Sequence, residues 1–233
     1  MKRRTTTWIF SLAMLGVMIM FTNGCKKSSD SSSTTVAITD ADGNVYHTVT
    51  IGTQVWMVEN LKTTKYNDGT SIPLVSDTSW TNLTTAAYCW YNNDASWKPI
   101  YGALYNWYAV NSGILAPKGF HIATRAEWAT LIAYLGGDTL AGGKLKSTGT
   151  VEAITGLWLS PNKGATNSSG FTAYPGGYRS VAFQWINSFG YWWTATINGT
   201  STAWDCWMRF DNTDVYTEYS LKTNGYCVRC VKD

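Results

Sequence analysis

Aromatic side chains are the feature that most constrains how this chain can fold. The sequence holds 13 Trp, 14 Tyr and 7 Phe among 233 residues, while only 14% of the residues are charged. This supply of aromatic surface excludes a disordered chain, which has few aromatic residues and high charge. The 21 Gly and 5 Pro indicate many turns but exclude a collagen-like or Pro-rich fibre. We therefore expect a globular domain held together by aromatic packing.

The N-terminal segment has the pattern of an export signal. Met1–Arg4 carries three basic residues, and the mostly apolar run Trp8–Phe21 follows. This run is shorter than the roughly 20 apolar residues of a spanning helix. Cys25, directly after Gly24, resembles the lipidation site of bacterial lipoproteins, in which the thiol is acylated. The alternatives are a plain signal peptide with a free Cys25 and a retained transmembrane anchor.

This interpretation divides the chain into a lipoprotein signal peptide over 1–24, a lipidated Cys with a Ser-rich tether over 25–35, and one domain over 36–233. Lys26–Thr35 has no apolar residue and would reach roughly 17 Å as a random coil. In the lipoproteins that it resembles, Asp after the Cys favours inner-membrane retention, whereas Lys26 stands here. We therefore expect a protein anchored by lipid to the outer membrane, on either of its faces.

The charge balance argues against binding to nucleic acid. The formal charge is +3 from 18 Lys+Arg and 15 Asp+Glu. Removal of Lys2, Arg3 and Arg4 with the signal leaves 18 − 3 = 15 basic residues, so the mature chain is neutral. Nucleic-acid binding needs a basic surplus or stripe, and no such partner is expected.

The domain reads as α+β, with short antiparallel strands, two helices and long aromatic-rich loops. Expected strands cover 34–39, 45–51, 54–58, 190–196, 203–211 and 226–231, and the last three are expected to pair antiparallel. Asp40–Asn44 has the composition of a hairpin turn. A calcium loop is the alternative, but it requires Gly at its sixth position and Glu at its twelfth, whereas Gly43 is fourth and Ile51 is twelfth.

Two helices are predicted, over 101–110 and 124–135. The second begins with a capping box of Thr124 and Glu127 and ends at Gly136. Its apolar residues recur at i, i+3, i+4 and i+7, which indicates one buried face. The roughly fifty residues after Asp138 combine Gly, Ser, Thr and Asn with aromatic residues, and loops are expected there.

The cysteine count favours disulfides. Cys89, Cys206, Cys227 and Cys230 form an even set in an exported chain. Cys227 and Cys230 lie three apart on a predicted strand, so their side chains leave opposite faces. The pairings left are Cys206–Cys227 with Cys89–Cys230, or Cys89–Cys227 with Cys206–Cys230. The first is preferred because Cys206 is expected on the strand beside the last one.

Several stretches resemble, in order, the motifs of the Fibrobacter succinogenes major paralogous domain family. They are Val45–Leu61, Cys89–Asp94, Tyr101–Trp107, Pro117–Trp128, Pro175–Arg179 and Val228–Val231. The resemblance spans about 39–232. It implies a C-type-lectin-like fold, similar to that of formylglycine-generating enzymes, and a lipoprotein of Bacteroidota-like bacteria. It implies no agreed biochemical activity, and fold analogy alone does not supply one.

An enzyme is the less favoured interpretation. Formylglycine-generating enzymes use two reactive cysteines with copper, and Cys227 and Cys230 are superficially placed for that role. His47 and His121 are the only possible histidine bases, and His121 is expected to be a core histidine with structural hydrogen bonds. The sequence has no Gly-x-Ser-x-Gly, His-Glu-x-x-His or P-loop motif. No catalytic residue, metal ligand or cofactor is assigned, and calcium binding lacks the sugar-binding loop motifs of the lectins.

A binding or adhesion module without catalysis is the favoured interpretation, with glycan or protein as ligand. Trp and Tyr stack on sugar faces and make rigid contact surfaces. The candidates on expected loops are Trp80, Trp97, Trp158 and Trp185, with the polar residues Asn92, Asn93, Asp94, Asn162 and Asn167. Each of these tryptophans could instead belong to the core. The alternative function is a structural subunit of a surface assembly.

Overall fold

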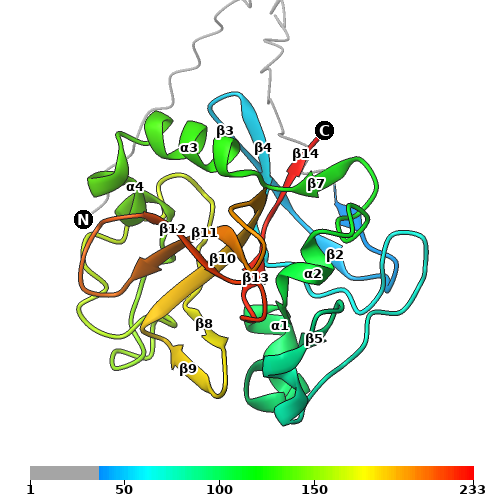
Figure 1. Cartoon of the computed structure of the whole chain (residues 1–233). Coiled ribbons are helices and arrows are strands. Elements are labelled where there is room, and N and C mark those ends of the chain that lie inside the picture. The colour runs from blue at the N-terminus through cyan, green and yellow to red at the C-terminus, as the bar shows by residue number, and fades with distance from the viewer. Residues whose placement is uncertain (1–36) are drawn as a thin grey trace, which may run out of the picture. The chain divides into compact units, whose positions relative to one another are not determined.

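The computed structural model describes residues 37–233. The expected signal peptide, the Cys25 lipidation site, the tether and the start of the first strand lie outside the described residues. Figure 1 shows a mixed helix-and-sheet domain in which several antiparallel sheets curl into half a barrel. The α+β prediction is confirmed at this level. Within 37–233, no helix is long and apolar enough to cross a membrane.

One sheet joins the beginning and the end of the domain. Its strands run in the order β3 (Thr48–Ile51), β4 (Gln54–Met57), β14 (Cys230–Lys232) and β7 (Phe120–Ile122). A hairpin of β1 (Ile38–Thr39) and β2 (Val45–Tyr46) precedes it. Val231 in β14 lies opposite Trp56 in β4. The expected short strands are present, but they do not form one meander, because the expected strand over 45–51 divides at His47 into β2 and β3, which belong to different sheets.

A six-stranded sheet occupies the C-terminal half. Its path is β12 (Tyr216–Leu221), β11 (Thr202–Arg209), β10 (Phe189–Ile197), β8 (Gly176–Arg179) and β9 (Phe183–Ile186), and β13 (Cys227–Val228) also pairs with β10. β10 and β11 are antiparallel as predicted, whereas β13 runs parallel to β10. The expected single strand over 226–231 is therefore wrong. It divides at Arg229, where the chain passes from one sheet to the other.

The predicted helix over 101–110 is wrong. The chain instead forms α1 (Lys98–Tyr101), β6 (Leu104–Tyr105) paired with β5 (Tyr88–Cys89), and α2 (Trp107–Val110). Gly102 breaks the helix because its φ is +75° and a Cβ there would lie 2.7 Å from the Leu61 carbonyl oxygen. Short 3₁₀ helices precede α1, namely η1 (Thr78–Asn82), η2 (Tyr91–Asn93) and η3 (Ala95–Trp97).

The second predicted helix is confirmed as α3 (Arg125–Tyr134). The Thr124 hydroxyl accepts the Glu127 N–H at 3.2 Å, and the Glu127 carboxylate accepts the Thr124 N–H at 2.8 Å. These two bonds form the expected capping box. The helix buries Trp128 against Trp192 of β10, with ring centroids 6.1 Å apart.

The structure contains a helix that the sequence pattern does not indicate, α4 (Asp138–Leu145). Gly142 and Gly143 lower the helix propensity of this segment, and loops were expected here. Both glycines are needed for packing: a Cβ on Gly142 would lie 2.6 Å from the Asp214 carbonyl oxygen, and one on Gly143 would lie 2.6 Å from the Gly164 carbonyl oxygen. Close backbone contact therefore outweighs local propensity.

The predicted disulfides are wrong, since Cys89, Cys206, Cys227 and Cys230 are all free and buried. Cys206 and Cys227 both lie opposite Trp192, on the two sides of β10. Two strand spacings of about 4.8 Å each place their Cα atoms about 10 Å apart. This distance exceeds the roughly 7 Å between Cα atoms that a disulfide can bridge. Cys230 packs in the cluster around Trp193, while the other three pack in the cluster around Trp192. This separates Cys230 from a partner in either pairing.

Buried cations connect the loops instead. Lys146, Arg179, Lys222 and Arg229 are almost completely buried. Each donates hydrogen bonds to backbone carbonyl groups of other segments. Lys146 illustrates the arrangement, because its Nζ donates to the carbonyls of Lys163, Arg209 and Asn212 at 2.8–3.1 Å. Charge-assisted bonds of this kind give hydrogen-bond partners to backbone carbonyls in the loops and at the strand ends.

Candidate functional site

Aromatic side chains line one face of the six-stranded sheet. Tyr191 of β10, Trp207 of β11 and Tyr216 of β12 lie directly opposite one another across the strands, so their side chains share a face. The Trp207 and Tyr216 rings stack at 3.8 Å with an interplanar angle of 9°. The opposite face carries Trp192 and packs against α3. This row forms the centre of a candidate binding surface.

Two further rings extend the row. Phe189 stacks on Tyr191 with centroids 5.8 Å apart, and it lies 5.4 Å from Trp185 of β9. We call Trp185, Phe189, Tyr191, Trp207 and Tyr216 the aromatic platform. Four of these residues are half-buried, and Trp185 is 52% exposed. A continuous apolar surface is therefore accessible to solvent.

Trp185 is held in an unfavourable backbone conformation. Its φ is +62°, a region in which a bulky residue is a genuine outlier. Such a conformation costs on the order of 1–3 kcal/mol and tends to occur at functional positions. Gly177 makes room for it, because a Cβ there would lie 2.3 Å from the Gln184 carbonyl oxygen. The fold thus keeps Trp185 exposed at the cost of strain.

Polar groups surround the aromatic platform. Arg209 forms an ion pair with Asp211, and its guanidinium lies 5.9 Å from the centre of the Phe189 ring. Gln184 accepts the Tyr178 hydroxyl at 3.2 Å. Glu218, which is exposed, lies near the indole N–H of Trp207. These groups could exchange hydrogen bonds with the hydroxyls of a sugar stacked on the rings.

A buried acid lies at the covered end of the same face. Asp205 stands between Trp193 and Glu218 in the strand register and is 1% exposed. Its Oδ2 has no hydrogen-bond partner among the described residues. Burial raises the pKa of Asp205 to about 7, a value that already includes the lowering by the hydrogen bond with Ser220 and the raising by the nearby Glu218. At neutral pH this carboxyl group is therefore partly protonated.

Two of the predicted ligand-contacting tryptophans belong to the core. Trp80 and Trp158 are at most 1% exposed. The Arg179 guanidinium lies 4.5 Å from the Trp80 ring, and the Trp158 indole N–H donates to the Ala173 carbonyl at 3.0 Å. Their prediction as ligand contacts is wrong, because the loops that carry them fold inward under buried cations.

The predicted polar partners divide between the core and a separate turn. Asn162 is buried and donates to the carbonyls of Ser147 and Gly149, and Asn167 bonds to Thr172. The exposed set consists of Asn92, Asn93 and Asp94, beside the half-buried Trp97. Tyr91 anchors this turn on Phe183, with centroids 5.3 Å apart. Phe183 and Tyr91 pack in the core cluster around Trp192, on the opposite side of the sheet from Tyr191, so the turn is not part of the platform.

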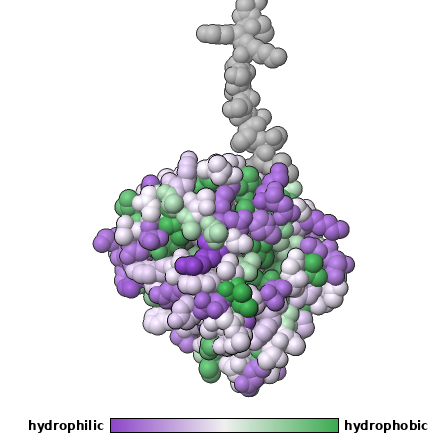
Figure 2. Space-filling model, turned by 45° about the horizontal axis from the view of Figure 1, so that its top comes forward, coloured by the Kyte–Doolittle hydropathy of each residue, from purple (hydrophilic) through white to green (hydrophobic). Residues whose placement is uncertain are grey.

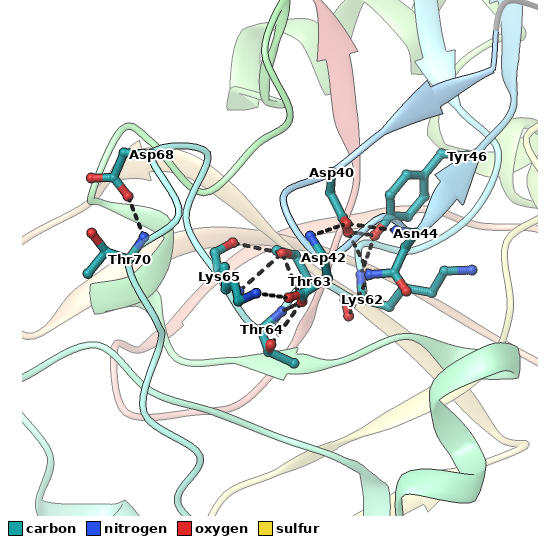
Figure 3. A network of polar contacts seen from close by, with 10 residues as sticks. All are labelled: Asp40, Asp42, Asn44, Tyr46, Lys62, Thr63, Thr64, Lys65, Asp68 and Thr70. Carbon is teal, nitrogen blue, oxygen red and sulfur yellow. Dashed lines mark hydrogen bonds and ion pairs between the residues drawn. The ribbon is translucent and has the colours of Figure 1, made fainter.

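The Asp40–Asn44 segment is a hairpin turn, as predicted. Figure 3 shows that its carboxylates are occupied by protein donors. Asp40 accepts the Asn44 N–H and the Tyr46 hydroxyl, at 2.9 and 2.6 Å. Asp42 accepts the Thr64 hydroxyl at 2.8 Å. Within the described part of the chain, no group of three or more His, Cys, Asp or Glu side chains could hold a metal ion.

His121 bridges two acids rather than lying in the core. Its Nε2 is 2.7 Å from Glu127 and its Nδ1 is 2.8 Å from Asp233, while 39% of the side chain is exposed. Burial opposes protonation, but the hydrogen bonds to Asp233 and Glu127 outweigh it and raise the pKa of His121. The expected structural hydrogen bonding is confirmed. The expected core position is wrong.

The possible reactive cysteine pair has no supporting geometry. Cys227 and Cys230 are almost fully buried in different core clusters. Burial raises the pKa of Cys227 to about 12 and raises that of Cys230 as well. Both therefore remain thiols at neutral pH, and a buried thiol is a poor nucleophile.

The sequence candidates include Trp185 but miss the other four platform residues. Tyr191 lies on the strand predicted over 190–196, Phe189 lies one residue before its predicted start, and Trp207 lies on the next predicted strand. Alternation along these strands was the available signal, since residues at i and i+2 share a face. Tyr216 carried no such signal because its strand is polar and was not predicted.

Comparison with known proteins identifies one family. The family described as Fibrobacter succinogenes major domain matches residues 49–232, most of the chain. No curated protein and no solved structure matches.

Proposed function

The chain belongs to the Fibrobacter succinogenes major domain family, and we propose that it is a non-catalytic module that binds glycans on the aromatic platform. The observation that carries this proposal is Trp185, whose ring is 52% exposed and whose φ is +62°. An exposed Trp in a strained backbone conformation lowers the stability of the fold, and a purely structural surface has no need of it.

The platform has the chemistry that sugar recognition requires. Pyranose rings present apolar C–H faces, which stack on Trp and Tyr, and their hydroxyl groups require hydrogen-bond partners. Trp185, Trp207 and Tyr216 supply the stacking surfaces, and Gln184 and Arg209 supply polar contacts beside them. A protein ligand is the second possibility and would use the same rings as anchors.

We also propose the finer features of fold and location. The mixed helix-and-sheet architecture and the family membership are compatible with a C-type-lectin-like fold. The pattern up to Cys25 supports an outer-membrane lipoprotein. Cys25→Ala should release the protein from the membrane fraction of the producing cell. Continued membrane association of that variant would favour an uncleaved anchor.

A glycan array is the direct test of the binding function. The full chain, solubilised in mild detergent, is applied with calcium and again with chelator. Bound glycans are then titrated by calorimetry against Trp185→Ala and against Tyr134→Ala. Tyr134 is the matched control because it is an aromatic residue on α3, away from the platform, and is 66% exposed.

Trp185→Ala should weaken binding by about tenfold to a hundredfold, since stacked aromatic contacts contribute roughly 1–3 kcal/mol. Tyr134→Ala should leave the affinity unchanged. A blank array, or equal affinity of the wild type and Trp185→Ala, would contradict glycan binding on the platform. That result would favour a protein ligand or the structural role in a surface assembly.

A further inference from the structure

The outer edge of β12 is partly unpaired. β12 is the last strand of its sheet, and the Lys222 N–H donates inward to the Ser201 carbonyl at 2.9 Å. Because hydrogen-bonded residues alternate along an antiparallel pair, the even-numbered residues of β12 face β11. Thr217 and Tyr219 therefore direct their N–H and C=O groups outward. Among the described residues, neither of them has a backbone partner on that side.

A groove of about 1060 Å³ lies between this strand and α3. On the helix side, its wall consists largely of the exposed small residues Ala126, Ala129 and Ala133. Their spacing places them on one face of α3. At the start of β12, the Val215 N–H donates to the Asp138 carbonyl at 2.8 Å, which closes this end of the strand edge. Figure 1 shows α3 and α4 at the same end of the domain as β11 and β12.

The two ends of the groove differ in charge. Asp138 and Asp214 line the closed end, and Arg125 lines the other. The Arg125 guanidinium lies 3.7 Å from the centre of the Trp204 ring, and Trp204 is opposite Tyr219 in the register. Arg125 therefore lies near Tyr219 in the unpaired part of β12, whereas Asp214 precedes that strand, which begins at Tyr216.

We propose that this groove binds an extended polypeptide segment of a partner protein as an added strand on β12. Main-chain hydrogen bonds to Thr217 and Tyr219 would hold the segment, as in other cases of strand addition. Its side chains on the groove side would pack against the alanine wall of α3. A positive group of the segment meets Asp138 and Asp214, and an acidic side chain meets Arg125.

The charged ends of the groove distinguish between two possible occupants, a partner protein and a second copy of this chain. β12 of another copy would present Tyr216–Leu221, which contains Glu218 and no basic residue. Lys222, which follows directly, is buried and donates to the Gly199 and Thr200 carbonyls, so this strand offers no free positive group to the acidic end of the groove. The surface shown in Figure 2 carries hydrophobic residues only as small patches among hydrophilic ones. That face offers no large apolar interface of the kind that obligate dimers bury.

Peptide selection on the full chain in detergent tests the proposal. A displayed library of random short peptides is selected on the wild type, and the recovered peptides are synthesised. Their affinities are compared for Ala129→Gln, which narrows the groove with a longer side chain on its α3 wall, and for Thr130→Gln, a substitution to the same residue at an adjacent exposed position outside the groove lining. Amide hydrogen exchange of Thr217 and Tyr219 is measured with and without bound peptide.

We expect peptides with one basic end, loss of about tenfold or more in affinity for Ala129→Gln, and unchanged affinity for Thr130→Gln. The Thr217 and Tyr219 amides should exchange rapidly in the free chain and slow about tenfold on binding. Failure to recover any peptide, or binding that leaves both amides unprotected, overturns the proposal. Dimerisation of the chain that protects the same amides overturns it in favour of a second copy.

Discussion

Replacing Asp205 by Asn should remove most of a pH dependence that the wild-type protein shows between pH 4 and 7. Asp205 is 1% exposed and its Oδ2 has no partner among the described residues. Burial raises its pKa to about 7, whereas an unfolded chain has an Asp pKa of about 3.9. The folded state therefore holds a proton over this interval that the unfolded state has lost.

The sign follows from this difference in bound protons. Because the pKa of Asp205 is raised on folding, its contribution to stability is fully present below about pH 4 and is lost as pH rises through about 7. A difference of about 3 pKa units at 1.36 kcal/mol each gives about 4 kcal/mol over the whole interval. Between pH 5 and pH 8 the loss is about 3 kcal/mol, since most of the titration lies there.

Urea unfolding followed by Trp fluorescence at pH 5 and at pH 8 measures this directly. The Asn side chain has nearly the same shape as Asp and does not titrate. The free energy of unfolding of Asp205→Asn should therefore decrease by about 3 kcal/mol less than that of the wild type between pH 5 and pH 8. The contribution of His121 to the free energy of unfolding also decreases as pH rises, because its pKa is raised in the folded state. His121 is present in both proteins, so its contribution cancels in the comparison. Parallel pH profiles of the two proteins would refute the reasoning about Asp205.

Three further substitutions test the packing. Arg229→Met removes four hydrogen bonds of 2.7–2.9 Å, to the Asn60 side chain and to the carbonyls of Met57, Phe171 and Thr172. The free energy of unfolding in urea should fall by more than about 4 kcal/mol. A decrease below about 1 kcal/mol would show that water replaces the guanidinium. Thr124→Ala should cost about 1 kcal/mol by removing the capping box of α3; an unchanged unfolding midpoint would contradict this. Gly142→Ala should lower the melting temperature although Ala favours helices by about 1 kcal/mol, because its Cβ would lie 2.6 Å from the Asp214 carbonyl oxygen; a raised melting temperature would show that the contact relaxes.

Local patterns determined the parts of this fold whose signals are local. The α3 helix carries its own capping box, apolar face and terminal glycines, so it could be predicted from Thr124 to Leu135. The hairpin at Asp40–Asn44 carries its own turn chemistry, in which the Asp40 carboxylate accepts the Asp42 and Asn44 N–H groups. β10 and β11 show β-branched and aromatic residues in strand spacing. In each case the stabilising groups lie within a few residues of one another.

Only the tertiary structure decided the rest. Gly102 ends a helical pattern because the Leu61 carbonyl is close, and Gly142 enters a helix because the Asp214 carbonyl is close. The cysteine pairing failed because β10 lies between the strands of Cys206 and Cys227.

Contacts between residues distant in the sequence also decide which tryptophans belong to the platform. Trp80 and Trp185 look alike in the sequence, yet one lies under Arg179 in the core and the other is exposed beside Phe189. Burial of a tryptophan depends on which distant strand or cation reaches it, and no spacing along the chain contains that information.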